Sequence, residues 1–186
     1  MNVTYRLAPL APWPAGAEDL AAAVKWVSDK IGERGGNAAR IYLVGHSAGA
    51  VHVASYVSHP EFHQMKGGGG LAGAIMLSGI YDLTAAPLAE TQRAYFGTDP
   101  ARYADQSSLK GLVTTEIPLM LAAAELDPAG FVLQFDLAKQ ASCKRASGCA
   151  HTLLLPQHSH MSEVYSINTA DTRLTDEILD FVKTGK

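Results

Sequence analysis

Residues 45–49 read Gly-His-Ser-Ala-Gly, a pattern that suits a nucleophilic serine. The apolar run 41–44 before it predicts a strand, and the run after it predicts a helix over 48–58. Strand, Gly-x-Ser-x-Gly and helix together are the context of a nucleophile elbow, although the five residues alone also occur in ordinary turns. The tight turn favours glycine at Gly45 and Gly49, and the following helix N-terminus favours negative charge developing beside Ser47.

A nucleophilic serine needs a general base, and the expected place for it is the loop after the last strand. His158 and His160 both follow the predicted strand 152–155, and His160 is the favoured base. A His-x-His pair also suits zinc, but no third ligand lies at a supporting spacing, so we expect no metal and no cofactor. His46 fills the variable position of the elbow, where we expect it to touch substrate. The other histidines are interpreted as surface or helix residues: His52, His59, His63 and His151.

The base in turn needs an acid in a loop just after a strand. Asp127 follows the predicted strand 117–123 and is the favoured acid, because Pro128 suits the first turn of the next helix. Glu125 in the same loop and Asp82 after the strand 71–77 remain alternatives.

Strands and helices alternate along the chain, which predicts an α/β fold with a mostly parallel sheet and helices on both faces. The expected strands are 3–7, 41–44, 71–77, 117–123 and 152–155, and the expected helices are 17–33, 48–58, 131–141 and an amphipathic one through 174–182. Segment 83–115 interrupts the alternation and carries Tyr95 and Phe96. It is either a wall or lid of an acyl pocket, with these two residues facing substrate, or a surface insertion.

The composition fits one globular domain over residues 1–186. The net charge of −3, with no basic block, argues against a nucleic-acid partner. The chain has no apolar run near the roughly 20 residues of a membrane span and opens without a signal-peptide pattern, so we expect a cytoplasmic protein. For Cys143 and Cys149, two free thiols are favoured over a disulfide.

Several longer stretches resemble carboxylesterases of the α/β-hydrolase fold. Residues 2–9 (Asn-Val-Thr-Tyr-Arg-Leu-Ala-Pro), residues 13–16 and the pair Glu18-Asp19 resemble the hormone-sensitive-lipase-like and feruloyl-esterase-like groups. Residues 78–83, 95–97 and 158–163 are similar to the second group, which includes kynurenine formamidases. The resemblance implies an α/β-hydrolase fold with the catalytic order Ser47, Asp127, His160.

The chain departs from these families at its start. They carry a His-Gly-Gly loop upstream of the Asn-Tyr-Arg strand, and its N–H groups form most of the oxyanion hole. This chain begins at that strand, so the resemblance implies an N-terminally truncated fold in which Ala48 N–H is the available oxyanion donor. The glycine run 67–70 is expected at the opposite end of the sheet and does not replace the loop.

The same departure leaves strand 41–44 without a neighbour on one side. Either residues 2–7 shift to pair with it, or a second chain covers it. We expect a homodimer with part of its interface in residues 1–40.

The expected function is hydrolysis of short-chain acyl or aryl esters through an acyl-enzyme on Ser47. An arylformamidase-like amidase is the enzymatic alternative. A truncated hydrolase of weak or no activity, used as a binding protein, is the alternative outside enzymes.

Overall fold

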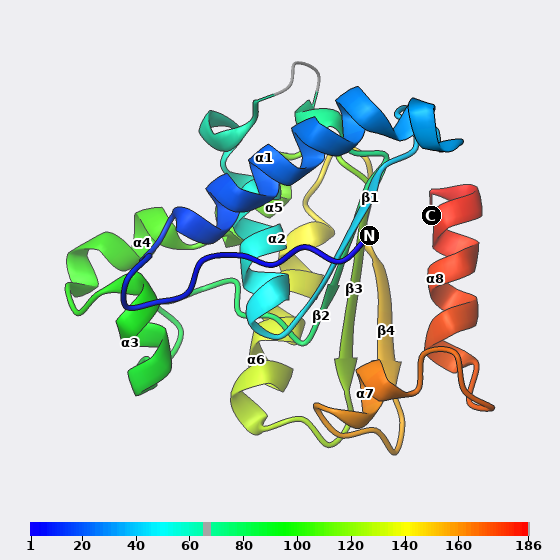
Figure 1. The fold of residues 1–186 in the computed structure, drawn as a ribbon. Coiled ribbons are helices and arrows are strands. Elements are labelled where there is room, and N and C mark those ends of the chain that lie inside the picture. The colour runs from blue at the N-terminus through cyan, green and yellow to red at the C-terminus, as the bar shows by residue number, and fades with distance from the viewer. Residues whose placement is uncertain (65–67, 186) are drawn as a thin grey trace.

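The structure, a computed structural model, describes residues 1–64 and 68–185. Its centre is a sheet of four parallel strands in the order β1-β2-β3-β4 (Figure 1). The strands are β1 (Tyr42–His46), β2 (Gly73–Leu77), β3 (Leu119–Ala124) and β4 (His151–Leu155). The predictions for these four strands are confirmed to within two residues at each end.

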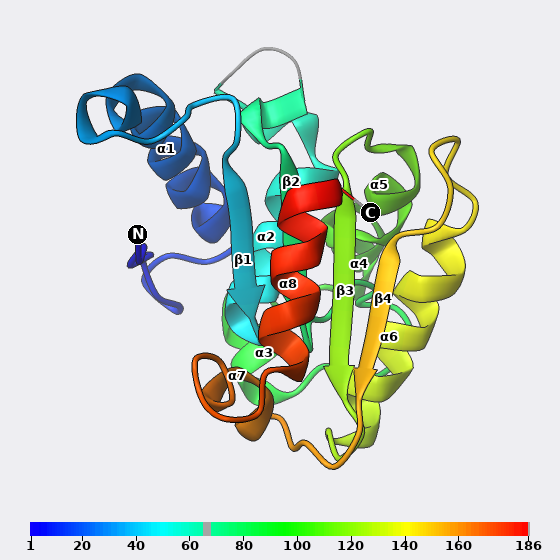
Figure 2. The same cartoon turned by 90° about the vertical axis from the view of Figure 1, so that its right-hand side faces the viewer.

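Helices cover both faces of the sheet, as predicted (Figures 1 and 2). One face carries α1 (Ala15–Lys30), α2 (Ala48–Ser58), α5 (Leu109–Thr114) and α6 (Ala129–Ser142), and the other carries α8 (Arg173–Thr184). Shorter helices are α3 (Glu90–Phe96), α4 (Tyr103–Gln106) and α7 (Ser162–Tyr165). Single 3₁₀ turns occur at Ile31–Arg34, Pro60–Phe62, Gly68–Gly70 and Pro100–Arg102.

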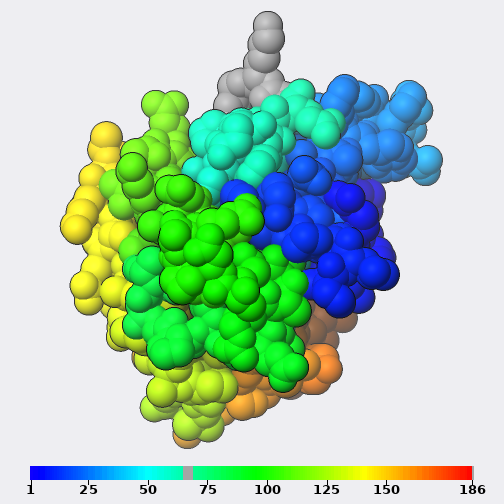
Figure 3. Space-filling view, turned by 90° about the vertical axis from the view of Figure 1, so that its left-hand side faces the viewer, coloured from blue at the N-terminus to red at the C-terminus, as the bar shows by residue number. Residues whose placement is uncertain are grey.

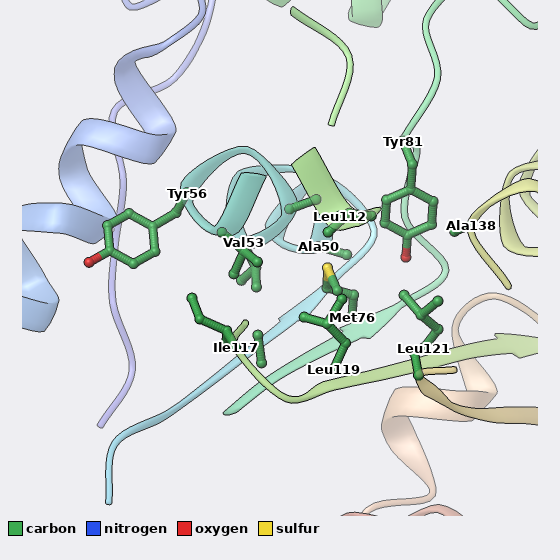
Figure 4. Packing of buried hydrophobic residues seen from close by; sticks show 14 of the residues in the cluster. Ala50, Val53, Tyr56, Met76, Tyr81, Leu112, Ile117, Leu119, Leu121 and Ala138 are labelled. Carbon is green, nitrogen blue, oxygen red and sulfur yellow. The ribbon is translucent and has the colours of Figure 1, made fainter. Parts of the chain in front are cut away.

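The two central strands, β2 and β3, are apolar on both faces because every residue of each is buried. Met76, Leu119 and Leu121 point toward α2 and α5, where they meet Ala50, Val53 and Leu112 (Figure 4). The alternate strand residues point the other way, as the two-residue period of a strand requires. They pack against α8, and this second cluster contains Ile75, Leu77, Met120, Ala122, Leu155, Leu174 and Phe181.

The predicted strand at 3–7 is wrong. Residues 1–7 form no strand, and the pairing of residues 2–7 with 41–44, one of the two alternatives for this edge, is absent, so β1 is an edge of the sheet. A β-forming run becomes a strand only beside a pairing partner, and this run instead lies against α1. The backbone N–H and Nε of Arg6 each donate to the Asp19 carboxylate at 2.8 Å, and Nη2 lies 3.1 Å from Glu18. These contacts explain why Arg6 and the Glu-Asp pair occur together in the sequence.

Two smaller expectations have mixed outcomes. Cys143 and Cys149 form a disulfide, so the preference for free thiols is wrong. They flank a turn at the end of α6 that brings the two thiols together. Of the glycine run 67–70, Gly67 lies outside the described residues, and Gly68–Gly70 forms a turn before β2, at the amino end of the sheet as expected.

Candidate active site

Ser47 lies in a sharp turn between the end of β1 and the start of α2. Its backbone has φ 54° and ψ −117°, a conformation that costs energy for any residue with a side chain. The backbone N–H of Ser47 donates to the carbonyl of Leu77 on β2 at 2.9 Å, which holds the turn on the sheet. A Cβ atom on Gly45 would lie 2.4 Å from the Gly49 carbonyl, so glycine is required at Gly45. Glycine is not required at Gly49, because a Cβ atom built there would have no described heavy atom within 4 Å.

Three predicted residues meet at the carboxyl end of the sheet. Nε2 of His160 lies 2.9 Å from Oγ of Ser47, and Nδ1 of His160 lies 2.7 Å from Oδ1 of Asp127. The Asp127 side chain is fully buried, whereas His160 keeps 21% of its side chain exposed. The imidazole therefore bridges a buried carboxylate and a hydroxyl, the arrangement of a general base with its orienting acid.

The second oxygen of Asp127 is fixed by two donors that sequence reasoning did not identify. Ser78 Oγ donates to Oδ2 at 2.5 Å, and the backbone N–H of Ala124 donates to the same atom at 3.0 Å. These bonds favour the ionised carboxylate and turn its other oxygen toward His160. No spacing rule signals Ser78, which follows β2 and lies 49 positions before Asp127 in the sequence.

The structure places the rival residues elsewhere. Asp82 accepts from the backbone and hydroxyl of Thr84 in its own turn. Glu125 accepts from the backbone N–H of Gln157 at 2.7 Å and so orders the loop. Nε2 of His158 lies 3.0 Å from Asp171, and His158 is buried.

His46, which we expected to touch substrate, lies beside His160 and does not line the cavity described below. The two ring centroids are 4.7 Å apart, and Nε2 of His46 donates to the carbonyl oxygen of His160 at 2.8 Å. The same nitrogen lies 3.2 Å from Oε1 of Glu163, whose side chain is fully buried. The Glu163 carboxylate raises the pKa of His46 above its ordinary value, against the opposing effect of burial.

A cavity of about 350 Å³ opens in front of Ser47. Apolar and aromatic side chains make up most of its wall, and the predicted Tyr95 and Phe96 of α3 are among them. The cavity is lined by Ser47, Ala48, Val51, His52, Ile80, Thr91, Gln92, Tyr95, Phe96, Phe131 and residues 5–8. In Figure 3 the segment around α3, drawn in green, lies next to the N-terminal residues, drawn in blue. Segments far apart in the sequence thus share one wall.

Ala48 is the first residue of α2, so its N–H has no acceptor within the helix and is free for an anion. Phe131, in the first turn of α6, packs its ring 4.4 Å from that of His160. Sequence reasoning did not identify Phe131, because one aromatic residue on an amphipathic helix carries no signal of this contact.

His52, predicted to be a surface or helix residue, is a buried residue of the helix α2 and lines the cavity. Its ring packs between Tyr5 at 4.3 Å and Tyr95 at 5.0 Å. Burial lowers the pKa of His52 to about 4, so the ring is neutral at neutral pH.

Among the described residues, His46, His160 and Glu163 place a ligand atom each within 4.8 Å of one another. This set is small enough to surround a divalent ion. Coordination would, however, take His160 away from Ser47 or Asp127, both of which it already contacts. Across residues 1–64 and 68–185, no helix is long and apolar enough to cross a membrane.

Solved structures similar to this chain include esterases. The chain aligns over 97% of its length with the carboxylesterase EstE1 from a metagenomic library, at a TM-score of 0.76 and 22% identity, covering 67% of that protein. It also aligns over 97% with a hyperthermophilic esterase of the archaeon Pyrobaculum calidifontis, at a TM-score of 0.77 and 21% identity, covering 62% of it. At these identities the likeness shows the fold.

Sequence comparison adds a shorter and closer match. Over 49 residues the chain is 49% identical to carboxylesterase NlhH of Mycobacterium tuberculosis. The aligned segment is 26% of this chain and 15% of that enzyme. A sequence profile of the alpha/beta hydrolase fold family matches residues 1–129, more than half of the chain. Together with the parallel sheet and the serine turn after β1, this match shows that the chain belongs to the α/β-hydrolase fold family.

Proposed function

We propose that this chain hydrolyses carboxylic esters through an acyl-enzyme on Ser47, with His160 as general base and Asp127 as the orienting acid. The observation that carries the proposal is the continuous hydrogen-bonded chain from Ser47 through His160 to Asp127, with distances of 2.9 and 2.7 Å. Similarity to proteins named as carboxylesterases supports the same reaction.

In the proposed reaction Ser47 Oγ attacks the ester carbonyl while Nε2 of His160 takes its proton. The N–H of Ala48 and the N-terminus of α2 stabilise the oxyanion of the tetrahedral intermediate. Collapse of the intermediate breaks the bond to the alkoxy group, which leaves as an alcohol with the proton from His160. Water, activated by His160, then attacks the acyl-enzyme, and Ser47 is regenerated as the acid is released.

The cavity supports short acyl or aryl groups as substrates. Its volume of about 350 Å³ lies at the small end of ligand sites. Tyr95 and Phe96 bring aromatic surface from the segment 83–115, which we interpret as the wall of the acyl pocket. Phe131 closes the side next to His160.

The experiment is turnover of 4-nitrophenyl acetate compared with N-formylkynurenine, for the wild type and Ser47→Ala. We expect hydrolysis of the ester, loss of activity in Ser47→Ala, and labelling of wild-type Ser47 by a fluorophosphonate. Faster turnover of N-formylkynurenine would assign the amidase reaction instead. Absence of labelling would favour a binding protein, because labelling requires an activated hydroxyl.

We also propose that a second copy of the chain covers the β1 edge, forming a homodimer. The Val44 side chain on this edge is 50% exposed, and an apolar edge strand is an aggregation hazard. Light scattering should give twice the monomer mass, and Val44→Lys should yield the monomer. A monomeric wild type at micromolar concentration would refute the dimer.

A cytoplasmic location stays a prediction. The Cys143–Cys149 disulfide opposes it, because disulfides persist mainly in oxidising compartments. Cell fractionation with an antibody against the chain tests it directly.

A further inference from the structure

A second buried carboxylate lies next to His160. Glu163 belongs to the first turn of α7, and its side chain is fully buried. One of its oxygens lies within 4.8 Å of a ring nitrogen of His160. Within the described part of the chain, neither carboxylate oxygen has a hydrogen-bond donor, and the basic side chain at ion-pair distance is His46, whose Nε2 lies 3.2 Å from Oε1.

An unbalanced charge at Glu163 would work against the proposed chemistry. The imidazole of His160 already contacts the Asp127 carboxylate. An opposite charge within about 4–6 Å favours the protonated imidazole and raises its pKa by about 1–3. A protonated His160 has no lone pair for the Ser47 proton. A second, unbalanced carboxylate would therefore keep His160 protonated near neutral pH and prevent it from acting as the base.

His46 is placed to cancel that charge. Its Nε2 contacts Glu163 and also donates to the backbone carbonyl of His160. The pKa of His46 is raised, chiefly by Glu163, so the ring gains a positive charge more readily than a free imidazole does. The other ionisable groups near the pair are Asp127, His160 and Tyr81. Tyr81 is neutral, because its complete burial raises the pKa of its hydroxyl.

We propose that His46 and Glu163 form an internal ion pair that positions His160 through its backbone carbonyl and cancels the charge of Glu163 at its ring. The proposal rests on the ester hydrolysis proposed above, in which His160 acts as a neutral base. Both residues are positioning residues, since neither lines the cavity in front of Ser47.

The test compares His46→Gln, Glu163→Gln and the double variant in the pH dependence of kcat/KM for 4-nitrophenyl acetate. His46→Gln leaves the Glu163 charge unbalanced, so its acid limb should move to higher pH by about one unit or more. Glu163→Gln removes the charge and should not move the acid limb to higher pH. The double variant should return the limb to within about 0.3 unit of the wild type, a compensation that loss of packing does not produce.

A second measurement does not depend on activity. In an NMR titration of the wild type, the His46 ring should titrate above a free imidazole, and in Glu163→Gln its titration should move down by about one unit. An active wild type whose acid limb is the same in all three variants would overturn the ion pair and leave the ester hydrolysis standing. An inactive wild type would overturn the proposed ester hydrolysis. The NMR titration would then test the ion pair alone, and an unchanged His46 titration midpoint in Glu163→Gln would overturn that pair.

Discussion

Asp127→Asn is a sharp test of the triad, because the structure fixes which way the new amide must point. The backbone N–H of Ala124 donates to Oδ2 of Asp127 at 3.0 Å. In the variant the amide oxygen must take this position, since an NH₂ group there would leave the Ala124 N–H without an acceptor. The NH₂ group then faces Nδ1 of His160, which lies 2.7 Å from the carboxylate in the wild type.

The consequence is an imidazole with its proton on the wrong nitrogen. An NH₂ group donating to Nδ1 holds the ring proton on Nε2, the atom 2.9 Å from Ser47 Oγ. Nε2 then has no lone pair for the serine proton. A triad locked in this tautomer loses about 10⁴-fold in kcat. The loss corresponds to about 5 kcal/mol of transition-state stabilisation.

The assay is the kcat for 4-nitrophenyl acetate, with ¹⁵N NMR of His160 to identify the tautomer. Asp82→Asn is the matched control, because the Asp82 side chain accepts from Thr84 in its own turn and its contacts with Gln134 use the backbone, which the substitution keeps. It should retain most of the activity. A loss below about tenfold in Asp127→Asn, in a variant that melts cooperatively, would refute the assignment of Asp127 as the orienting acid.

Three further predictions concern stability. Gly45→Ala should lower the free energy of unfolding by about 1–3 kcal/mol or prevent folding, because the Cβ of the new alanine meets the Gly49 backbone. Gly49→Ala should leave the free energy of unfolding nearly unchanged. Urea denaturation midpoints compare the two variants. His52 binds a proton more readily in the unfolded chain than in the folded one, so the wild type should lose up to about 3 kcal/mol of stability as the pH falls from 6.5 through 4. His52→Gln should lose less over the same range. Urea titrations at pH 7 and 4 measure both losses, and equal losses in the two proteins would refute the prediction. Protein purified without reductant should give no free thiol in a denatured thiol titration, and Cys143→Ala with Cys149→Ala should cost roughly 2 kcal/mol.

The sequence predicted the elements whose determinants are local. The boundaries of the helix after Ser47 agree with α2 at both ends, because a glycine turn begins it and His59-Pro60 ends it. The four strands of the sheet were found because each is an apolar run between turn residues. Residues 3–7 have the same local character, but a strand also requires a neighbour, and pairing is set by parts of the chain far away in sequence.

The contacts around the site show the same division. The motif order of Ser47, Asp127 and His160 and their places just after successive strands predicted that they meet, and the structure brings them together. The contact of His46 with Glu163 joins residues on two different elements, and no periodicity or motif relates them. The disulfide depends on a turn geometry that two cysteines in a sequence do not reveal.

The docking of α8 has a consequence for how the protein loses function. Arg173, the first residue of α8, donates to the carbonyl of Pro156 at 3.2 Å and pairs with Asp171, which in turn contacts His158. The loop that carries His160 is thus tied to α8, whereas Ser47 is tied to the core on the opposite face of the sheet. Detachment of α8 would remove the Arg173 contacts from this loop and leave it held by its contacts with Glu125 and Asp127, while the core around α2 stays folded. We therefore expect partial unfolding to separate His160 from Ser47, so that inactivation on heating precedes global melting and follows hydrogen exchange at the amides of α8.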